Sequence, residues 1–453
     1  MQLSTRLFGS TYQFKDIKDV LAKANEEKSG DILAEIAAHS VAERVAAKMV
    51  LSQLTLEDLR NNPVIPYEQD EVTRIIQDDL NLTIYDEIKN WTVEHLREYI
   101  LDLDTTGADL RRISRGLTSE MVAAVAKLMS NMDLVLAAQK IRVTAHCRTT
   151  IGEEGRLAVR LQPNHPTDDN DGILASLREG LSYGIGDAVI GINPVEDNPV
   201  STKRNLDMVF EFMQKYDIPT QSCVLSHVST QMEAIDNGAK TGLIFQSIAG
   251  TEAGNTSFGI DGKMIADAHK LGLERCVGEG PNVMYFETGQ GSELSAEAHG
   301  GADQVTLEAR CYGFAKRFQP FLVNTVVGFI GPEYLYDSKQ VTRAGLEDHF
   351  MGKLSGIPMG VDVCYTNHMK ADQNDLEDLA VLLTTAGCNY FMGVPMGDDI
   401  MLNYQTTSYH DIASLRTISK TRPLAEFEAW MEKMGLMENG RLTKKAGDAS
   451  VLM

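Results

Sequence analysis

The feature that most constrains the fold is a regular alternation that begins near residue 150. Eight apolar runs, each short enough to be a buried strand, are separated by segments whose apolar residues recur at helical spacing. The runs are 156–162, 187–194, 222–228, 242–247, 283–287, 321–332, 360–368 and 388–399. The helical stretches between them include Ile173–Leu181, Leu206–Tyr216, Met264–Leu271 and Leu376–Thr384. Eight strand–helix units in one chain predict an α/β fold, a (β/α)8 TIM barrel.

A doubly wound open sheet shows the same alternation and is the alternative fold. Dinucleotide-binding sheets of that kind carry G-x-G-x-x-G directly after the first strand. No such motif follows residue 162 in this sequence. The barrel is therefore the favoured prediction.

The first third of the chain has a different pattern, with apolar residues at helical spacing from residue 14 to about 140. Thr55 and Asp58 have the spacing of a capping box, which predicts a helix start. Pro63 predicts a break, and Met121–Leu136 is expected to form one long helix. We predict an N-terminal helical region over 1–140, a catalytic barrel over 141–435 and a C-terminal tail over 436–453. The helical region is expected to serve packing and assembly.

Composition excludes several classes of function. Of the 453 residues, 64 are acidic and 42 basic, a net charge of −22 that repels nucleic-acid phosphates. The six cysteines are scattered without a C-x-x-C pair, as expected for reduced thiols in the cytoplasm. Neither a signal peptide nor an apolar run of membrane-spanning length is found in the sequence. We expect a cytoplasmic protein with no nucleic-acid or membrane partner.

The C-terminal ends of the predicted strands bring one group of side chains to the mouth of the barrel. These residues are Arg160, Gln162, Asn193, Ser247, Glu287, Phe329 and Asp362. Two carboxylates suit an ammonium group, and an arginine suits an oxygen, so the set predicts a small, polar, cationic substrate. Taken singly, each residue also has a structural explanation. A strand-end Glu commonly pairs with Arg or Lys, and a strand-end Asn or Asp commonly caps the next helix.

Metal-binding motifs are not supported by the sequence. The histidines His227, His349, His368 and His410 are dispersed, without H-E-x-x-H or another short ligand spacing. The stretch from Asp362 to His368 is a weaker metal candidate. The stretch that begins at Asp168 resembles an EF-hand loop but lacks its final acid. No metal ligand is therefore predicted.

One further motif involves cobalamin. Asp267, His269 and Gly272 match D-x-H-x-x-G, by which some cobalamin proteins supply a histidine to cobalt. The match lies inside a predicted helix, and the usual downstream pattern is missing. We interpret it as a chance match, with His269 on the surface of that helix.

Several longer stretches resemble the large, catalytic subunits of ethanolamine ammonia-lyases. The most specific stretches are 59–63, 186–191 and YFETGQG at 285–291, and the others are 300–305, 323–334, 345–356 and 397–406. The resemblance extends over essentially the whole chain. It implies a (β/α)8 barrel that works with a small subunit, as a homo-oligomer of large subunits inside a hetero-oligomer.

The resemblance also implies a reaction and a cofactor. Members of this family use adenosylcobalamin to convert ethanolamine into acetaldehyde and ammonia by radical chemistry. The implied substrate-binding residues are Arg160, Gln162, Asn193, Glu287 and Asp362, with Glu287, Arg160 and Asp362 as the catalytic ones. The implied cobalamin-binding residues are Pro194, Gln246, Ser295 and Met401. Ser257 departs from the family pattern, where an acid is expected near the adenosyl group. Enclosure in a bacterial microcompartment is left open.

Two other functions remain open from the residues themselves. A cobalamin-independent barrel lyase or aldolase could use the same mouth for another small amino compound. A non-catalytic scaffold subunit could keep the fold without the chemistry, but it would not need five polar residues at the mouth.

Overall fold

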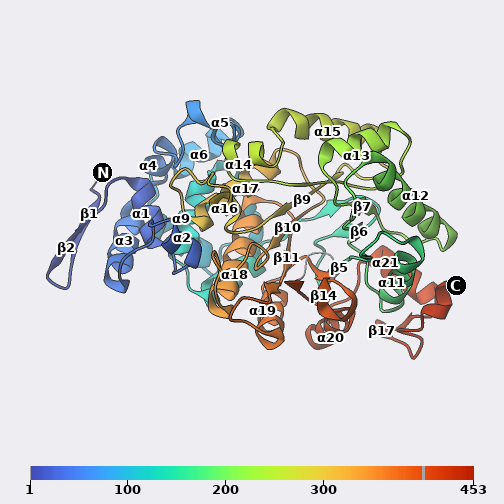
Figure 1. Ribbon diagram of the computed structural model, residues 1–453. Coiled ribbons are helices and arrows are strands. Elements are labelled where there is room, and N and C mark those ends of the chain that lie inside the picture. Colours follow the sequence, from blue (N-terminus) through green and yellow to red (C-terminus); the bar gives the residue numbers. More distant parts are fainter. Residues whose placement is uncertain (1, 400–403) are drawn as a thin grey trace.

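Eight parallel strands form the centre of the computed structural model, which describes residues 2–399 and 404–453 (Figure 1). The strands are β5 Ala158–Leu161, β6 Val189–Ile192, β7 Ser222–Val224, β8 Ile244–Ser247, β9 Met284–Thr288, β10 Leu322–Val326, β11 Met359–Asp362 and β13 Tyr390–Gly393. Their order is β7-β6-β5-β13-β11-β10-β9-β8, so the last strand pairs with the first. The barrel predicted from the sequence is confirmed.

The barrel is nearly closed, and its remaining gap lies between β7 and β8. No strand ladder joins this pair in the described chain, but the backbone N–H groups of Gly242 and Leu243 donate to the Ser222 carbonyl at 3.0 and 3.1 Å. Five of the eight strands are buried at every residue, and β8, β9 and β10 each have one half-buried residue. Strands buried on both faces read as continuous apolar runs, which is why the sequence revealed them. The predicted runs extended too far at 321–332, 360–368 and 388–399, where the chain leaves the sheet.

Helices surround the barrel and run back between its strands. They are α11 Asn170–Ser182, α12 Pro199–Lys215, α13 Val228–Asp236, α14 Glu252–Ser257, α15 Gly262–Arg275, α16 Ser292–Ser295, α17 Gln304–Lys316, α18 Ser338–Ser355, α19 Gln373–Thr385 and α20 Tyr409–Ser419. Short elements near the barrel are β3 Ala145–His146, β4 Thr150–Ile151, β12 Tyr365–Thr366, η3 Pro395–Gly397, β14 Asp398–Asp399 and β15 Tyr404–Gln405. The chain ends with α21 Ala425–Lys433, β16 Met437–Glu438, β17 Arg441–Leu442 and η4 Ala449–Leu452.

The N-terminal region is helical, as predicted, but begins with a hairpin that the sequence pattern did not show. Its elements are β1 Ser4–Leu7, β2 Ser10–Gln13, α1 Ile17–Ala24, α2 Ser29–Leu33, α3 Val41–Gln53, α4 Leu56–Asn61, η1 Tyr67–Gln69, α5 Glu71–Asp78, α6 Leu82–Ile88, α7 Val93–Leu101, α8 Gly107–Ile113, η2 Ser114–Gly116, α9 Ser119–Lys127 and α10 Asn131–Lys140. Figure 1 shows the hairpin projecting at the end of the molecule farthest from the C-terminus.

Local capping explains where several of these helices begin and end. The capping box of Thr55 and Asp58 is present at the start of α4, which ends just before Pro63 as expected. The single helix predicted over Met121–Leu136 is wrong. The chain forms α9 and α10 instead, because Ser130 and Asp133 make a second capping box that starts a new helix.

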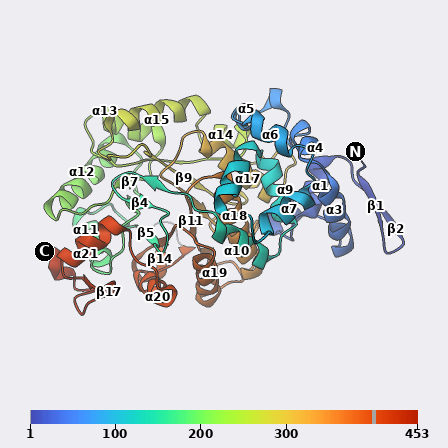
Figure 2. The ribbon, with the colours of Figure 1, turned by 180° about the vertical axis from the view of Figure 1, so that it is seen from behind.

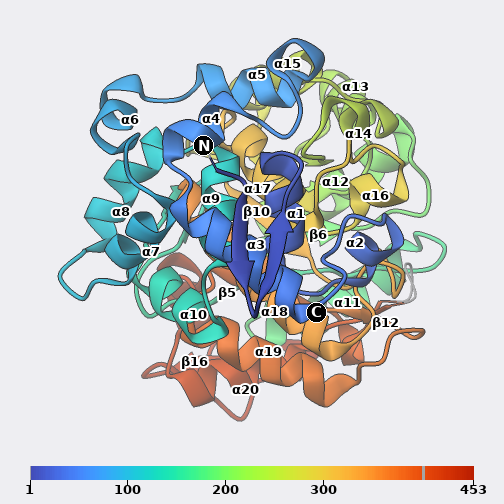
Figure 3. The same cartoon turned by 90° about the vertical axis from the view of Figure 1, so that its left-hand side faces the viewer.

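The N-terminal region packs on one side of the barrel, against α17 and α18 (Figure 2). Figure 3 looks onto this region, with α1 and α3 in front of the barrel. One continuous hydrophobic core includes residues of both parts. None of the helices in the described ranges has the length and apolar character needed to cross a membrane. The boundaries at residues 140 and 435 remain predictions.

Candidate active site

Glu287 lies near the C-terminal end of β9, at the mouth of the barrel. Its Oε1 accepts hydrogen bonds from Arg160 Nη1 at 2.7 Å, from Asn324 Nδ2 at 3.1 Å and from the Tyr285 hydroxyl. Within the described ranges, no hydrogen-bond donor reaches its Oε2. The structural explanation, a strand-end Glu paired with Arg, thus applies to Oε1 of Glu287. The other oxygen remains available to a ligand.

Arg160 lies on β5 and is fully buried. Its Nη1 donates to the Tyr285 hydroxyl at 2.6 Å, and its Nη2 donates to Gln162 Oε1 at 2.6 Å. Burial acts to lower the pKa of Arg160, but the partial and full negative charges of Tyr285 and Glu287 outweigh it, so the pKa is raised. The guanidinium therefore stays charged. A Cβ at Gly191 on β6 would lie 2.7 Å from Arg160 Nε, so the arginine requires a glycine there.

Asp362 ends β11 and is also fully buried. It accepts hydrogen bonds from the Tyr404 hydroxyl at 3.1 Å and from the Thr406 hydroxyl. Burial raises the pKa of Asp362 to about 7, and the negative charge of Glu287 contributes in the same direction. Within the described chain, neither a hydrogen bond nor an ion pair joins Asp362 to Arg160 or Glu287. Its carboxyl group has hydroxyl partners and no cationic one among the described residues.

Gln162 and Asn193 extend the site along β5 and β6. Gln162 is buried, and its Nε2 donates to Asp399 on β14. Asn193 is half-buried just after β6, and its backbone N–H donates to Asn164 Oδ1 at 2.9 Å. Among residues 2–399 and 404–453, the Asn193 side chain makes no hydrogen bond. The sequence thus placed five polar residues correctly at one mouth, while their roles in binding remain predictions.

A cavity of about 380 Å³ opens beside Glu287, between the ends of β8 and β9. Gln246, Ser247 and Phe329 line it, together with Phe258 and Ile330. Ser247 and Phe329 were expected at the mouth from their strand positions, and the structure places them there. The cavity is mostly apolar around Glu287, which is the usual character of a small-molecule site.

Three of the four predicted cobalamin residues lie on or after the C-terminal ends of barrel strands. Pro194 follows β6, Gln246 lies on β8 and accepts from the Val228 backbone N–H at 2.9 Å, and Ser295 is exposed on α16. Met401 lies outside the described residues. Ser257 is exposed on α14, where its hydroxyl donates to the Gly254 carbonyl at 2.7 Å.

Several mouth residues were missed from the sequence. Tyr285 precedes Glu287 by two positions, so it faces the same side of β9, and this periodicity could have revealed it. Asn324 is the register partner of Glu287 on β10. Register between distant strands cannot be read from one sequence. Tyr404 on β15 and Thr406 just after it donate to Asp362 from a segment too short to carry a periodic signal.

The discounted motifs lie away from the mouth or lack ligand geometry. Asp267, His269 and Gly272 all lie in α15, on the outside of the barrel, as the chance-match interpretation requires. The expected surface position of His269 is wrong in part. The ring is half-buried, with its edge toward Phe318 at a centroid distance of 6.3 Å, and burial lowers its pKa. In residues 2–399 and 404–453, no group of three or more His, Cys, Asp or Glu could hold a metal ion.

Comparison with known proteins now adds to this geometry. The family profile described as "Ethanolamine ammonia lyase large subunit (EutB)" matches residues 12–445. The chain belongs to this family. The ethanolamine ammonia-lyase large subunits of Escherichia coli strain K12 and of Salmonella typhimurium strain LT2 are each 60% identical to it over 451 residues, covering 100% of both chains. The resemblance found in the sequence is thereby confirmed over the full length of an ethanolamine ammonia-lyase large subunit.

Proposed function

We propose that this chain is the catalytic large subunit of an ethanolamine ammonia-lyase, which converts ethanolamine into acetaldehyde and ammonia with adenosylcobalamin. The observation that carries the proposal is the charge balance of the mouth. Arg160 pairs with Glu287, and Asp362 has no cationic partner among the described residues, so the site has room for one more positive charge. The ammonium group of ethanolamine supplies that charge, and the 60% identity to named ethanolamine ammonia-lyases indicates the same substrate.

The substrate ammonium is held between the two carboxylates. The open Oε2 of Glu287 accepts one of its hydrogens, and ionised Asp362 provides the second negative charge. Arg160 lies beside Glu287 and Gln162, where its charge stabilises the hydroxyl oxygen of ethanolamine. Glu287 Oε2 also takes and returns a proton as the amino group moves from one carbon to the next.

The residues around the mouth fit cobalamin. Gln246 is a buried amide at the cavity wall, Pro194 and Ser295 lie nearby on loop or helix ends, and none of the three is charged. A neutral amide and a hydroxyl suit the amide groups around a corrin ring, and Phe258 and Ile330 suit its apolar parts. When bound, adenosylcobalamin supplies the radical chemistry that removes and returns a substrate hydrogen. Pro194, Gln246, Ser295 and Met401 would hold it.

The names of the relatives also indicate a partner. A protein called a large subunit works with a smaller one, so we propose a hetero-oligomer of small subunits and several copies of this chain. We further propose the cytoplasm as its location and keep a bacterial microcompartment as an alternative setting.

The test is to co-produce the chain with a small subunit of an ethanolamine ammonia-lyase and to measure acetaldehyde formed from ethanolamine. We expect activity with adenosylcobalamin and none without it. Activity without cobalamin would favour the alternative lyase or aldolase. An intact assembly that binds cobalamin but forms no product would favour a scaffold subunit.

A further inference from the structure

A second large cavity lies at the opposite end of the barrel from the mouth. Its volume is about 480 Å³, and its walls include Leu157 and Asn389, the residues just before β5 and β13. The last turns of α10, α18 and α19 and part of α8 complete it. We call this cavity the barrel-base pocket. Nothing in the proposed deamination uses it.

Positive charge is concentrated in the barrel-base pocket. Five basic residues line it against two acids, and the basic ones are Arg111, Lys140, Arg142, Arg156 and Lys353. Two of the five are paired: Arg156 with Glu428, and Arg142 with the exposed Glu154 at 2.7 Å. An exposed pair of the second kind is weak, because water screens it. The chain as a whole carries a net charge of −22, so this local excess is unusual.

The other three cations have no carboxylate within ion-pair distance in the described part of the chain. They donate to backbone carbonyls instead. Arg111 Nη1 donates to the Arg142 carbonyl at 2.7 Å, and Lys353 Nζ donates to the Gly387 carbonyl at 2.9 Å. Lys140 Nζ donates to the carbonyls of Ile100 and Asp102 at 2.9 and 2.6 Å. Their hydrogen bonds are thus partly satisfied, but their charges are not balanced.

Lys353 is the most deeply buried of the three cations, with 3% of its surface exposed. Burial lowers the pKa of Lys353 to about 8, and the positive charge of Arg142 acts in the same direction. One helical turn earlier, the fully buried His349 makes no hydrogen bond of normal geometry through either ring nitrogen among the described residues. A buried ammonium without a counter-charge is unfavourable, so Lys353 indicates a missing negatively charged group, whereas His349 is not part of the cavity lining.

Helix ends are the simpler explanation for these cations. Arg111, Lys140 and Lys353 all lie in the last turns of α8, α10 and α18, where the carbonyl ends carry partial negative charge. Each helix end contributes only about half an elementary charge, and its effect extends over about one turn. The cavity lining also includes one acid without an ion pair among the described residues, Glu153. Helix ends therefore explain where each cation lies, but they do not explain why cations from three separate helices converge on one cavity.

We propose that the barrel-base pocket binds a phosphate group, either free or as a phosphate ester, through Arg111, Lys140 and Lys353. A phosphate monoester carries a charge of about −1.5 to −2 at neutral pH, which three cations can balance. Arginine and lysine are the side chains that recognise phosphate, the first by its planar donor fork and the second as a point charge. The cavity leaves room for the organic part of an ester.

The test is isothermal titration calorimetry on the assembled enzyme at constant ionic strength. Inorganic phosphate and adenosine 5′-monophosphate serve as probes, with chloride as the competing background ion. We expect one bound phosphate group per large subunit. Tighter binding of the nucleotide would identify an ester as the ligand, and equal binding would identify free phosphate.

The variants Arg111→Met and Arg112→Met provide a matched comparison. Both arginines are exposed on α8, but only Arg111 lines the pocket, since Arg112 pairs with Glu87 at 2.6 Å. We expect Arg111→Met to weaken phosphate binding at least about tenfold, as for a lost charge-assisted contact, and Arg112→Met to leave it unchanged. Lys353→Gln should abolish binding.

The proposal is overturned by either of two results. One is the absence of phosphate binding to a folded, assembled enzyme. The other is an equal loss of binding in Arg111→Met and Arg112→Met, which would indicate non-specific attraction to the surface. The arginine pair keeps the test decisive if Lys353→Gln does not fold.

Discussion

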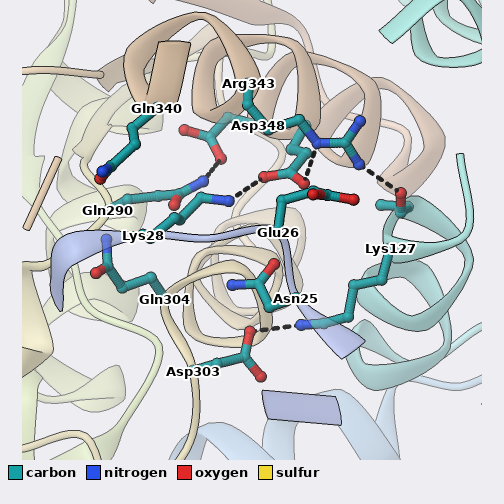
Figure 4. A network of polar contacts seen from close by, with 12 residues as sticks. Asn25, Glu26, Lys28, Lys127, Gln290, Asp303, Gln304, Gln340, Arg343 and Asp348 are labelled. Carbon is teal, nitrogen blue, oxygen red and sulfur yellow. Dashed lines mark hydrogen bonds and ion pairs between the residues drawn. The ribbon is translucent and has the colours of Figure 1, made fainter. Parts of the chain in front are cut away.

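Two fully buried carboxylates, Glu347 and Asp362, show how differently this protein uses charge. Glu347 lies where the N-terminal region meets α18, and it accepts from Lys28 at 2.8 Å and from Arg343 at 2.6 Å. Figure 4 shows Lys28 and Arg343 within this network of polar contacts. Burial acts to raise the pKa of Glu347, but these two cations bring it down to about 2. Asp362 at the barrel mouth has only hydroxyl partners in the described chain, and its pKa rises to about 7.

The contrast distinguishes the structural interface around Glu347 from the proposed substrate site around Asp362. At the interface the chain provides its own cations, and further buried pairs join Lys127 to Asp303 at 2.5 Å and Arg310 to Asp70 at 2.6 Å. These pairs tie the N-terminal region to α17 and α18.

At the mouth Arg160 pairs with Glu287, while Asp362 has no cationic partner among the described residues, and in the proposed function the substrate ammonium provides that charge. Balanced charge thus characterises these interface pairs, but a carboxyl group without a cation does not by itself define a site, since burial also raises the pKa of Asp348 on α18 to about 7.

The largest effect is expected at Arg160, the cation that pairs with Glu287 at the mouth. Arg160→Ala should lower kcat for ethanolamine at least about 10³-fold, because the developing charge on the substrate oxygen loses its partner. Added guanidinium should restore part of the activity, and Arg160→Lys should retain more activity than Arg160→Ala, since a cation remains. Equal activity of the Ala and Lys variants would show that charge is not the role of Arg160.

Replacing Lys28, a cation of the interface, should lower stability and leave turnover unchanged. Lys28→Met leaves Glu347 short of one partner, and we expect the free energy of unfolding to fall by about 3–5 kcal/mol, with kcat of the folded enzyme unchanged. The matched control is Lys433→Met, which breaks an exposed pair with Asp217 and should cost less than about 1 kcal/mol. Urea unfolding and steady-state kinetics measure both. A loss of kcat in folded Lys28→Met would show that Lys28 is not purely structural and would contradict the distinction between interface and mouth.

Glu287→Gln tests the proton role of the mouth carboxylate. The amide keeps the shape and one acceptor, but it loses the charge and the ability to exchange a proton. We expect kcat to fall about 10²-fold with normal assembly and cobalamin binding. Wild-type turnover in this variant would mean that the paired Oε1 is the only important atom of Glu287, which is the structural alternative.

The raised pKa of Asp362 predicts that KM for ethanolamine depends on pH. A pKa of about 7 means that the carboxyl is neutral in the free enzyme at lower pH, and an ammonium binds the ionised form. KM for ethanolamine should therefore rise about tenfold per pH unit below about 7 and level off above it. Asp362→Asn should raise KM at pH 8 and remove this dependence. An unchanged KM profile in that variant would exclude Asp362 from the ammonium site.

The smallest effect is expected outside both regions, at His269. The half-buried ring loses only an edge contact with Phe318 in His269→Ala, so the free energy of unfolding should change by about 1 kcal/mol or less. Cobalamin affinity should remain that of the wild type. The electron paramagnetic resonance spectrum of the cob(II)alamin enzyme should be unchanged by ¹⁵N-histidine labelling. An altered nitrogen splitting would show that a histidine ligates cobalt.

The sequence by itself determined the barrel and the main residues of its mouth. Strands buried on both faces must be apolar throughout, and their polar ends must meet at one rim, so the strand pattern alone places Arg160, Glu287 and Asp362 together. The helix start at Thr55 was equally readable, because a capping box is a local pattern. The second capping box, at Ser130, is just as local, so the break between α9 and α10 could have been predicted.

Only the tertiary structure decided which charged partners the buried carboxyl groups have. α17 and α18 are buried on nearly every side between barrel and N-terminal region, so they show little amphipathic pattern. The pairing of Asn324 with Glu287 depends on strand register, and the ion pair of Lys28 with Glu347 joins residues 319 positions apart. Burial and charge balance depend on such distant neighbours, because electrostatic interactions act through space and not along the chain. A carboxyl group thus has a structural role at Glu347 and is part of the proposed substrate site at Asp362.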